Sequence, residues 1–254
     1  MGRMNKTPRS HIAALICRDL RDAVRNRTAL VMVAACLAIA GLLNMVAQNG
    51  VRWEAGEAPA FLMTAVMCAA PAFVGCVVTL YVMAEERERG MYVTLAEAGV
   101  SLAEIAMAKL MACLVVTVAV EVLLCGALQL GVALGAATVG LSLLSMLPVL
   151  FAGTACGLLA TEQMASSVFA VPITLVAVMP MIAFLSPGLR QIWWILPAGQ
   201  AAEVTRVLCG MGAMAPIPLL VGLMLAWVVA ATALLVGAYR RAAIRLRSEL
   251  DRVR

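Results

Sequence analysis

Six long apolar segments constrain the fold of this chain more than any other feature. They cover residues 28–46, 59–84, 109–130, 138–160, 167–185 and 217–239. Each is near or above the ~20 residues that a helix needs to cross a ~30 Å hydrocarbon layer. In lipid, backbone polar groups are satisfied only within helices or closed barrels, and uninterrupted apolar runs do not fit the alternating strands of a barrel. The sequence therefore predicts an all-α, polytopic membrane protein with six transmembrane helices.

The composition supports the same class. Hydrophobic residues make up 64% of the 254 residues and charged residues only 13%, so lipid is the expected solvent for most of the surface. The first apolar run follows a basic stretch without a small-residue cleavage site, and we expect it to act as its own insertion signal. The sequence has no C-x-x-C, and His11 is its only histidine. We therefore predict no metal site, and no nucleic-acid site either, because retention of basic residues on one membrane face explains the net charge of +5.

The distribution of Lys and Arg predicts the orientation. Seven lie in residues 1–27, three in the segment from Glu85 to Lys109 and six in residues 240–254. The intervening loops contain only Arg52, Arg190 and Arg206. By the positive-inside rule, both termini are expected to be cytoplasmic, on either side of a membrane domain over residues 28–239. The tail, 240–254, is interpreted either as a basic helix along the lipid headgroups or as a frayed terminus.

The N-terminal segment, 1–27, has an amphipathic pattern. Ile12, Ile16 and Leu20 recur at helical spacing, while charged residues fill the other face. Such a helix is expected to lie in the membrane interface, with its arginines among the phosphates. The alternative is a segment whose charges only set the topology.

The segment from Glu85 to Lys109 is the one long charged stretch between apolar segments, and we expect it to face water. Gly90 and Gly99 are predicted break points, with a short helix over residues 91–98 between them. Ser101 and Glu104 have the spacing of a capping box, which predicts that another helix starts there.

Three groups of residues resemble the permease subunits of type-2 ATP-binding-cassette (ABC-2) exporters. The most specific is the cytoplasmic pattern Glu86-Arg87-Glu88-Arg89-Gly90, Val100-Ser101, Glu104-Ile105 and Lys109, at the family's spacing. It departs from the family at Met91-Tyr92-Val93, where the family has T-L-E, and at Gly99, where the family has Pro. The other two groups are Arg18-Asp19-Leu20-Arg21, at the place of the family's N-terminal elbow helix, and the outer loop 186–216. That loop contains Leu196-Pro197, a predicted short helix and Gly210.

The resemblance implies a coupling helix between the second and third transmembrane helices, which docks on a separate ATPase. The implied docking residues are Glu86, Arg87, Glu88, Arg89, Gly90, Val100, Ser101, Leu102, Glu104 and Ile105. It also implies two ATPase copies that bind ATP and Mg, a second permease chain (the same or a related one) and a bacterial plasma membrane. A solvated loop that only sets topology is the alternative for this segment.

The function expected from the resemblance is ATP-driven export of a hydrophobic or amphipathic cargo, such as a drug or an antimicrobial peptide. The sequence lacks a P-loop motif, and its lysines are Lys6 and Lys109 alone, so ATP hydrolysis is expected in the partner. No nucleophile–base pattern of a hydrolase or zinc protease occurs, so we expect no enzyme and no cofactor in this chain.

Glu121 lies near the middle of the third apolar segment and has two interpretations. An ionisable residue at this depth either lines a translocation path or is a packing element, hydrogen-bonded to Thr117 or to a neighbouring helix. Two alternative functions follow: a secondary transporter with Glu121 as its ion-coupling carboxylate, or a non-transporting membrane scaffold. Gly153 and Gly157 form a GxxxG motif that predicts close helix packing, while Pro148, Pro172 and Pro180 are predicted kinks.

Overall fold

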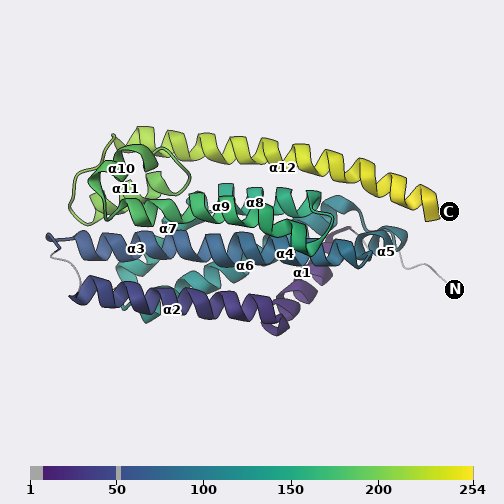
Figure 1. Ribbon diagram of the computed structural model, residues 1–254, viewed down its shortest axis with the longest axis horizontal. Coiled ribbons are helices and arrows are strands. Elements are labelled where there is room, and N and C mark those ends of the chain that lie inside the picture. Colours follow the sequence, from purple (N-terminus) through teal and green to yellow (C-terminus); the bar gives the residue numbers. More distant parts are fainter. Residues whose placement is uncertain (1–7, 50–52, 254) are drawn as a thin grey trace.

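Most of the described chain is helical, because its long apolar segments contain few residues that end a helix. The computed structural model describes residues 8–49 and 53–253, and in these ranges it has no strand (Figure 1). The helices are α1 (Pro8–Arg25), α2 (Arg27–Asn49), α3 (Glu57–Ala69), η1 (Ala70–Val78, a π-helix), α4 (Thr79–Glu88), α5 (Met91–Glu97), α6 (Leu102–Ala127), α7 (Gly131–Ser145), α8 (Leu147–Leu159), α9 (Gln163–Ala183), α10 (Pro187–Trp193), α11 (Gly199–Leu208) and α12 (Ile217–Val253). The all-α prediction is confirmed. Residues 1–7 and Arg52, to which the sequence assigns a side of the membrane, lie outside the described ranges.

Five helical stretches of the described chain are long and apolar enough to cross a membrane, and α7 with α8 adds a sixth if this bent pair is one span. The pair bends by 46° directly before Pro148, because proline cannot donate a backbone hydrogen bond to the preceding turn. Pro172 and Pro180, by contrast, lie inside α9, which continues past both. The length and composition of these helices indicate a multi-pass membrane protein, as expected.

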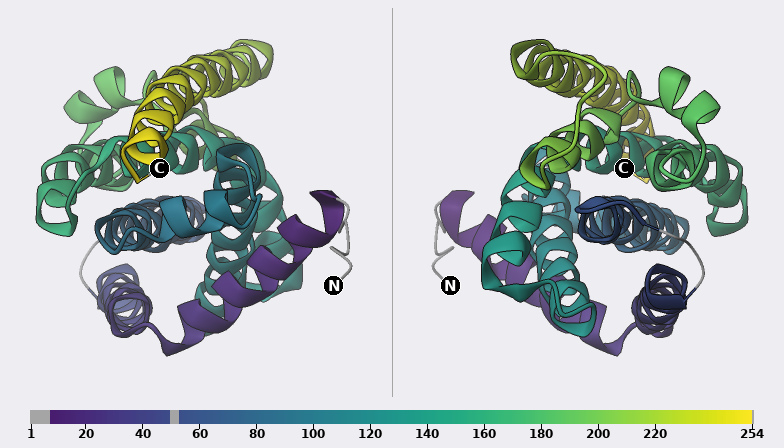
Figure 2. Two further views of the ribbon diagram at one scale, coloured as in Figure 1. Left: turned by 90° about the vertical axis from the view of Figure 1, so that its right-hand side faces the viewer. Right: turned by 90° about the vertical axis from the view of Figure 1, so that its left-hand side faces the viewer.

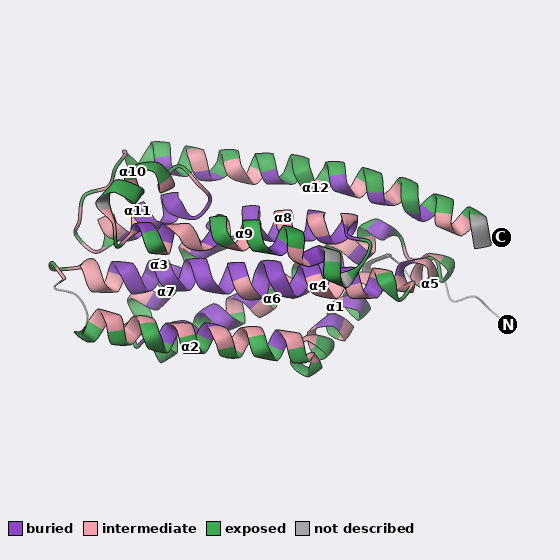
Figure 3. Cartoon of the chain, in the orientation of Figure 1, coloured by how far each residue is buried: buried purple, intermediate pink, exposed green. Residues whose placement is uncertain are grey.

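The continuous stretch α3–η1–α4 forms the centre of the bundle. Its most apolar window is 89% buried, whereas the corresponding window of α12 is 17% buried. Figure 3 shows the same contrast between the largely buried α3 and the mostly exposed α12. Gly153 and Gly157 of α8 pack against Cys76 and Met83 of this central stretch, where an added Cβ would meet neighbouring atoms at 3.0 Å. The close packing predicted from GxxxG is confirmed.

Several helix ends differ from the apolar segments that predict them. The second span continues to Glu88 and the third starts at Leu102, because turns and caps end a helix whereas hydropathy alone does not. Residues 240–253 belong to α12, which contains no glycine or proline after Gly237 to break it. Of the two interpretations of this tail, the described residues have the helical one, as the end of a membrane-length helix.

The two ends of the bundle carry different elements. The start of α1, the end of α12 and α5 lie toward one end, and α10 and α11 lie at the other (Figure 1). Helix α1 crosses the side of the bundle at an angle and packs on α6 (Figure 2). The outer loop contains two short helices, α10 and α11, whereas the sequence predicts one.

Candidate functional site

The short helix α5 and the turns around it stand between the second and third spans. The turns use glycine at the left-handed positions Gly90 (φ 69°) and Gly99 (φ 87°), which side chains with a Cβ rarely adopt. The Ser101 amide donates to Glu104 Oε2 at 2.8 Å, and the Glu104 amide donates to Ser101 Oγ at 3.2 Å. The predicted break points, the short helix and the capping box are all confirmed.

The inner face of α5 is anchored in an apolar cluster shared by five helices. Its buried residues are Met83, Tyr92, Leu102, Ile105, Leu158, Ala242 and Leu246. The Tyr92 hydroxyl donates to the Met83 carbonyl at 3.3 Å, and burial raises the pKa of Tyr92. It therefore remains a neutral hydrogen-bond donor, and α5 is fixed to α4 rather than held only by its two turns.

The residues assigned to docking by the resemblance differ in exposure. Glu88, Arg89 and Ser101 are exposed at this end of the bundle, together with Thr94 and Glu97 of α5. Leu102 and Ile105 are 7% and 1% exposed and point into the apolar cluster. Leu102 and Ile105 therefore cannot contact another protein without a rearrangement of this end.

Arg87, Val100 and Gly90 hold the local structure. Arg87 donates to the Leu158 carbonyl at 2.5 Å and lies 3.6 Å from the Glu249 carboxylate. The Val100 amide donates to the Leu95 carbonyl at 2.9 Å and closes the turn after α5. Arg87 therefore joins the C-terminal ends of α8 and α12 to α4.

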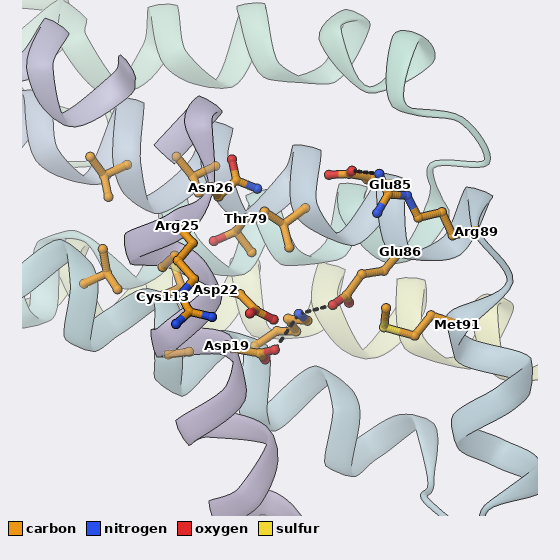
Figure 4. A pocket seen from close by; sticks show the side chains of 17 residues that line it. Asp19, Asp22, Arg25, Asn26, Thr79, Glu85, Glu86, Arg89, Met91 and Cys113 are labelled. Carbon is orange, nitrogen blue, oxygen red and sulfur yellow. Dashed lines mark hydrogen bonds and ion pairs between the residues drawn. The ribbon is translucent and has the colours of Figure 1, made fainter. Parts of the chain in front are cut away.

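A largely buried cluster of four charges lies beside this surface, formed by Arg18, Asp19, Glu86 and Lys109. Figure 4 shows two of its members, Asp19 and Glu86. Lys109 Nζ lies 2.9 Å from Asp19 Oδ1 and 2.6 Å from Glu86 Oε1. Arg18 Nη2 contacts the same two oxygens at 2.8 and 3.1 Å. We call these four residues the charge quartet; it joins α1, α4 and α6.

The charge quartet corrects two expectations. Glu86 and Lys109 do not face water, since they are 8% and 6% exposed, and Asp19 is buried at 8% rather than lying in the interface. The physical reason is charge balance: two acids can be buried with Lys109 and the partly exposed Arg18, whereas a single charge would have to remain in water. Leu20 is half-buried, and of the Arg18–Arg21 group only Arg21 is exposed.

The neighbouring carboxylates favour the charged form of Arg18. Although burial opposes the charge of Arg18, its hydrogen bond to Asp19 and the nearby carboxylates raise its pKa. Arg18 also reaches the Met91 sulfur at 3.6 Å, which adds α5 to the connected helices. Asp19 Oδ2 and Glu86 Oε2 are buried and have no hydrogen-bond partner among the described residues.

Glu121 lies away from this site, in the interior of the membrane region. It is fully buried and accepts a hydrogen bond from the Ser142 hydroxyl of α7. This contact with a neighbouring helix is the one that the packing interpretation predicts. Its partner is Ser142 and not Thr117, whose hydroxyl lies near Cys113.

One ion pair in the outer loop is not predicted by the sequence analysis. Arg190 donates to both carboxylate oxygens of Glu203, at 2.7 and 2.5 Å, and Glu203 also accepts from the Met214 amide at 2.8 Å. The thirteen-residue separation of the two charges gives no local signal, because the pair depends on how α10 folds back on α11.

No protein-family model matches this chain, and no curated protein matches it either. Its function must therefore be inferred from its residues and their geometry.

Proposed function

We propose that this chain is the membrane-spanning permease subunit of an ATP-driven exporter of the ABC-2 type. The observation that carries the proposal is α5, a short helix held between two spans at the end of the bundle where α12 ends. The motif spacing from Glu86 to Lys109 resembles that of the family over the same element. With α7 and α8 counted as one span, the described residues contain six helical stretches long and apolar enough to cross a membrane.

The docking surface for the ATPase is formed by the exposed residues of this end. These are Glu88, Arg89, Thr94, Glu97 and Ser101. They surround α5 and the capping box, so a protein seated here would touch both the short helix and the start of α6. Mixed charge on this surface suits a partner with complementary charged groups.

The buried residues of the same segment would transmit the movement. Tyr92, Leu102 and Ile105 share one apolar cluster with residues of α4, α8 and α12. Because a close-packed cluster resists compression, a displacement of α5 by ATPase closure would shift these helices together. In this proposal Leu102 and Ile105 couple the docking surface to the spans and do not contact the ATPase.

The orientation and partners follow from the same proposal. Both termini and α5 are cytoplasmic under the positive-inside rule, and the chain lies in a bacterial plasma membrane. Two ATPase subunits, which bind ATP and Mg, act on two permease chains. The exported hydrophobic or amphipathic cargo moves along the interface between the permeases.

A carrier that uses Glu121 as its ion-coupling carboxylate has less support. The side chain has no exposed surface, and one of its oxygens is hydrogen-bonded to Ser142. An ion-coupling carboxylate is expected to face a water-filled cavity or a path. A scaffold function has no geometric feature in its favour.

Affinity purification of the tagged chain from its native membrane, with mass spectrometry, tests the proposal. We expect a soluble ATPase with a Walker A lysine to copurify, and Glu97→Lys to reduce both its recovery and ATP-dependent transport. Glu54→Lys is the matched control, because Glu54 is exposed at the opposite end of the bundle. The proposal is wrong if no ATPase copurifies with an intact membrane complex, or if the two variants behave alike.

A further inference from the structure

A partly open cavity of about 390 Å³ lies between α1, η1, α4 and α6, next to the charge quartet (Figure 4). This volume is in the range of small-molecule sites in proteins. One part of its wall is apolar, with Val74, Val78, Val82 and Val116, and the other part is charged. The cavity therefore suits an amphipathic ligand, because it offers an apolar wall to one part of such a molecule and a charged wall to the other.

The charged part of the wall is balanced. Four carboxylates and three cationic side chains line the cavity, and Arg18 contacts two of those carboxylates, giving four charges of each sign. A ligand with a net charge would disturb this balance, whereas a zwitterion would not. The wall thus favours a ligand that carries one positive and one negative group.

Two of the carboxylates that line the cavity have an oxygen atom that accepts no hydrogen bond from the described residues. Asp19 and Glu86 both line the cavity and are both 8% exposed, and each has one oxygen without a hydrogen-bond partner among the described residues. Asp22 of α1 lines the same cavity and is exposed. Buried acceptors without partners are costly, so a ligand that brings N–H donors to this wall would be stabilised.

The position of the cavity points to the source of the ligand. Three of its four valines belong to the apolar stretch of the second span, and Val116 belongs to the third span. The charges of the second span that line the cavity begin where its apolar stretch ends, at Glu85. This is the depth at which lipid headgroups meet acyl chains. Arg25, at the last turn of α1, adds a cation suited to a phosphate.

We propose that this cavity binds a zwitterionic phospholipid with a primary ammonium, of the phosphatidylethanolamine class. The ammonium donates toward the carboxylates of Asp19, Asp22 and Glu86, and the phosphate pairs with Arg25. The first methylenes of an acyl chain lie along the valines. Phosphatidylcholine is excluded because its trimethylammonium has no N–H, and phosphatidylglycerol because it has no cation. This inference does not depend on the proposed export function.

The test uses the full chain with its membrane partners, in nanodiscs with equal amounts of phosphatidylethanolamine, phosphatidylcholine and phosphatidylglycerol. After mild detergent extraction, retained lipids are quantified by mass spectrometry. We expect phosphatidylethanolamine to be enriched over both other lipids. Asp22→Asn should lower this enrichment about fivefold through loss of a charge-assisted hydrogen bond. Val82→Trp, which fills the apolar part, should abolish it.

Glu162→Gln is the matched control, since Glu162 is an exposed acid directly before α9 that does not line the cavity. It should retain the full enrichment. If Val82→Trp does not give a monodisperse protein, the lipid enrichment of Asp22→Asn, a change at an exposed position, still tests the proposal. Equal retention of all three lipids, enrichment of phosphatidylglycerol, or unchanged enrichment in Asp22→Asn would overturn the proposal.

Discussion

Replacement of Lys109 by methionine tests whether the charge quartet holds α1 on the bundle. Methionine has a similar length but no charge, so the change removes the shared cation of Asp19 and Glu86 and leaves Arg18 in place. Lys109 Nζ makes the shortest contact of the quartet, 2.6 Å to Glu86, and the side chain is 6% exposed. The two carboxylates would then be buried with one cation between them.

The expected loss is large because these charges are buried. Removal of one partner from a buried ion pair typically costs about 3–5 kcal/mol, and the remaining Arg18 contacts place this case near ~3 kcal/mol. For a chain of this length, that corresponds to a decrease in Tm of roughly 6–12 °C. Arg89→Met removes an exposed pair with Glu85 on the same end of the bundle, in which the arginine side chain is 70% exposed. It should cost only about 0.3–0.5 kcal/mol, or roughly 1–2 °C.

The assay is thermal unfolding of the purified protein in one detergent, with both variants measured in parallel. The double variant Lys109→Met with Glu86→Gln restores a neutral cluster of Arg18 and Asp19 and should recover part of the lost Tm. If Lys109→Met lowers the Tm no more than Arg89→Met does, the quartet does not stabilise this fold. If the Tm of the double variant is not higher than that of Lys109→Met alone, charge imbalance is not the cause of the lost stability.

Three further predictions concern other parts of the bundle. Glu203→Ala should lower the Tm by several degrees, because it leaves the Arg190 guanidinium without its bidentate partner at a cost of about 3 kcal/mol, and an unchanged Tm would refute this. Gly153→Ala should cost about 1–2 kcal/mol because its Cβ meets backbone atoms of η1, whereas Gly140→Ala, in open space, should be neutral in the same unfolding assay. Glu121→Gln should leave transport within about twofold of the original rate, and a tenfold loss would favour the ion carrier instead.

Local rules account for the features that the sequence predicts well. The turns at Gly90 and Gly99 and the capping box at Ser101 depend on residues within a few positions of each other. Apolar segments long enough to span a membrane predict the helical class for a similar reason, since each satisfies its own backbone hydrogen bonds. These features need no knowledge of which helices are neighbours.

The charge quartet could not be predicted in this way. The ion pairs between its three helices join residues that are 23 to 90 positions apart, and each charge alone would be expected in water. Only the packing of α1 on α6 brings them together. The residue types were all singled out by the sequence analysis, but the interfacial helix and the coupling segment were treated as separate surfaces. Hydropathy also misplaced the end of the second span, because Glu86 is buried with its partners.

The quartet changes how the proposed coupling would act on α1. An amphipathic helix held only by the membrane surface could slide while α5 moved beneath it. Here Asp19 and Arg18 are paired with residues of α4 and α6, and Arg18 also contacts Met91 at the start of α5. A displacement of α5 that reached α4 and α6 would therefore carry α1 with them. Under the proposed function, Lys109→Met should weaken transport more than ATPase binding, because it loosens this connection and leaves the exposed docking surface unchanged.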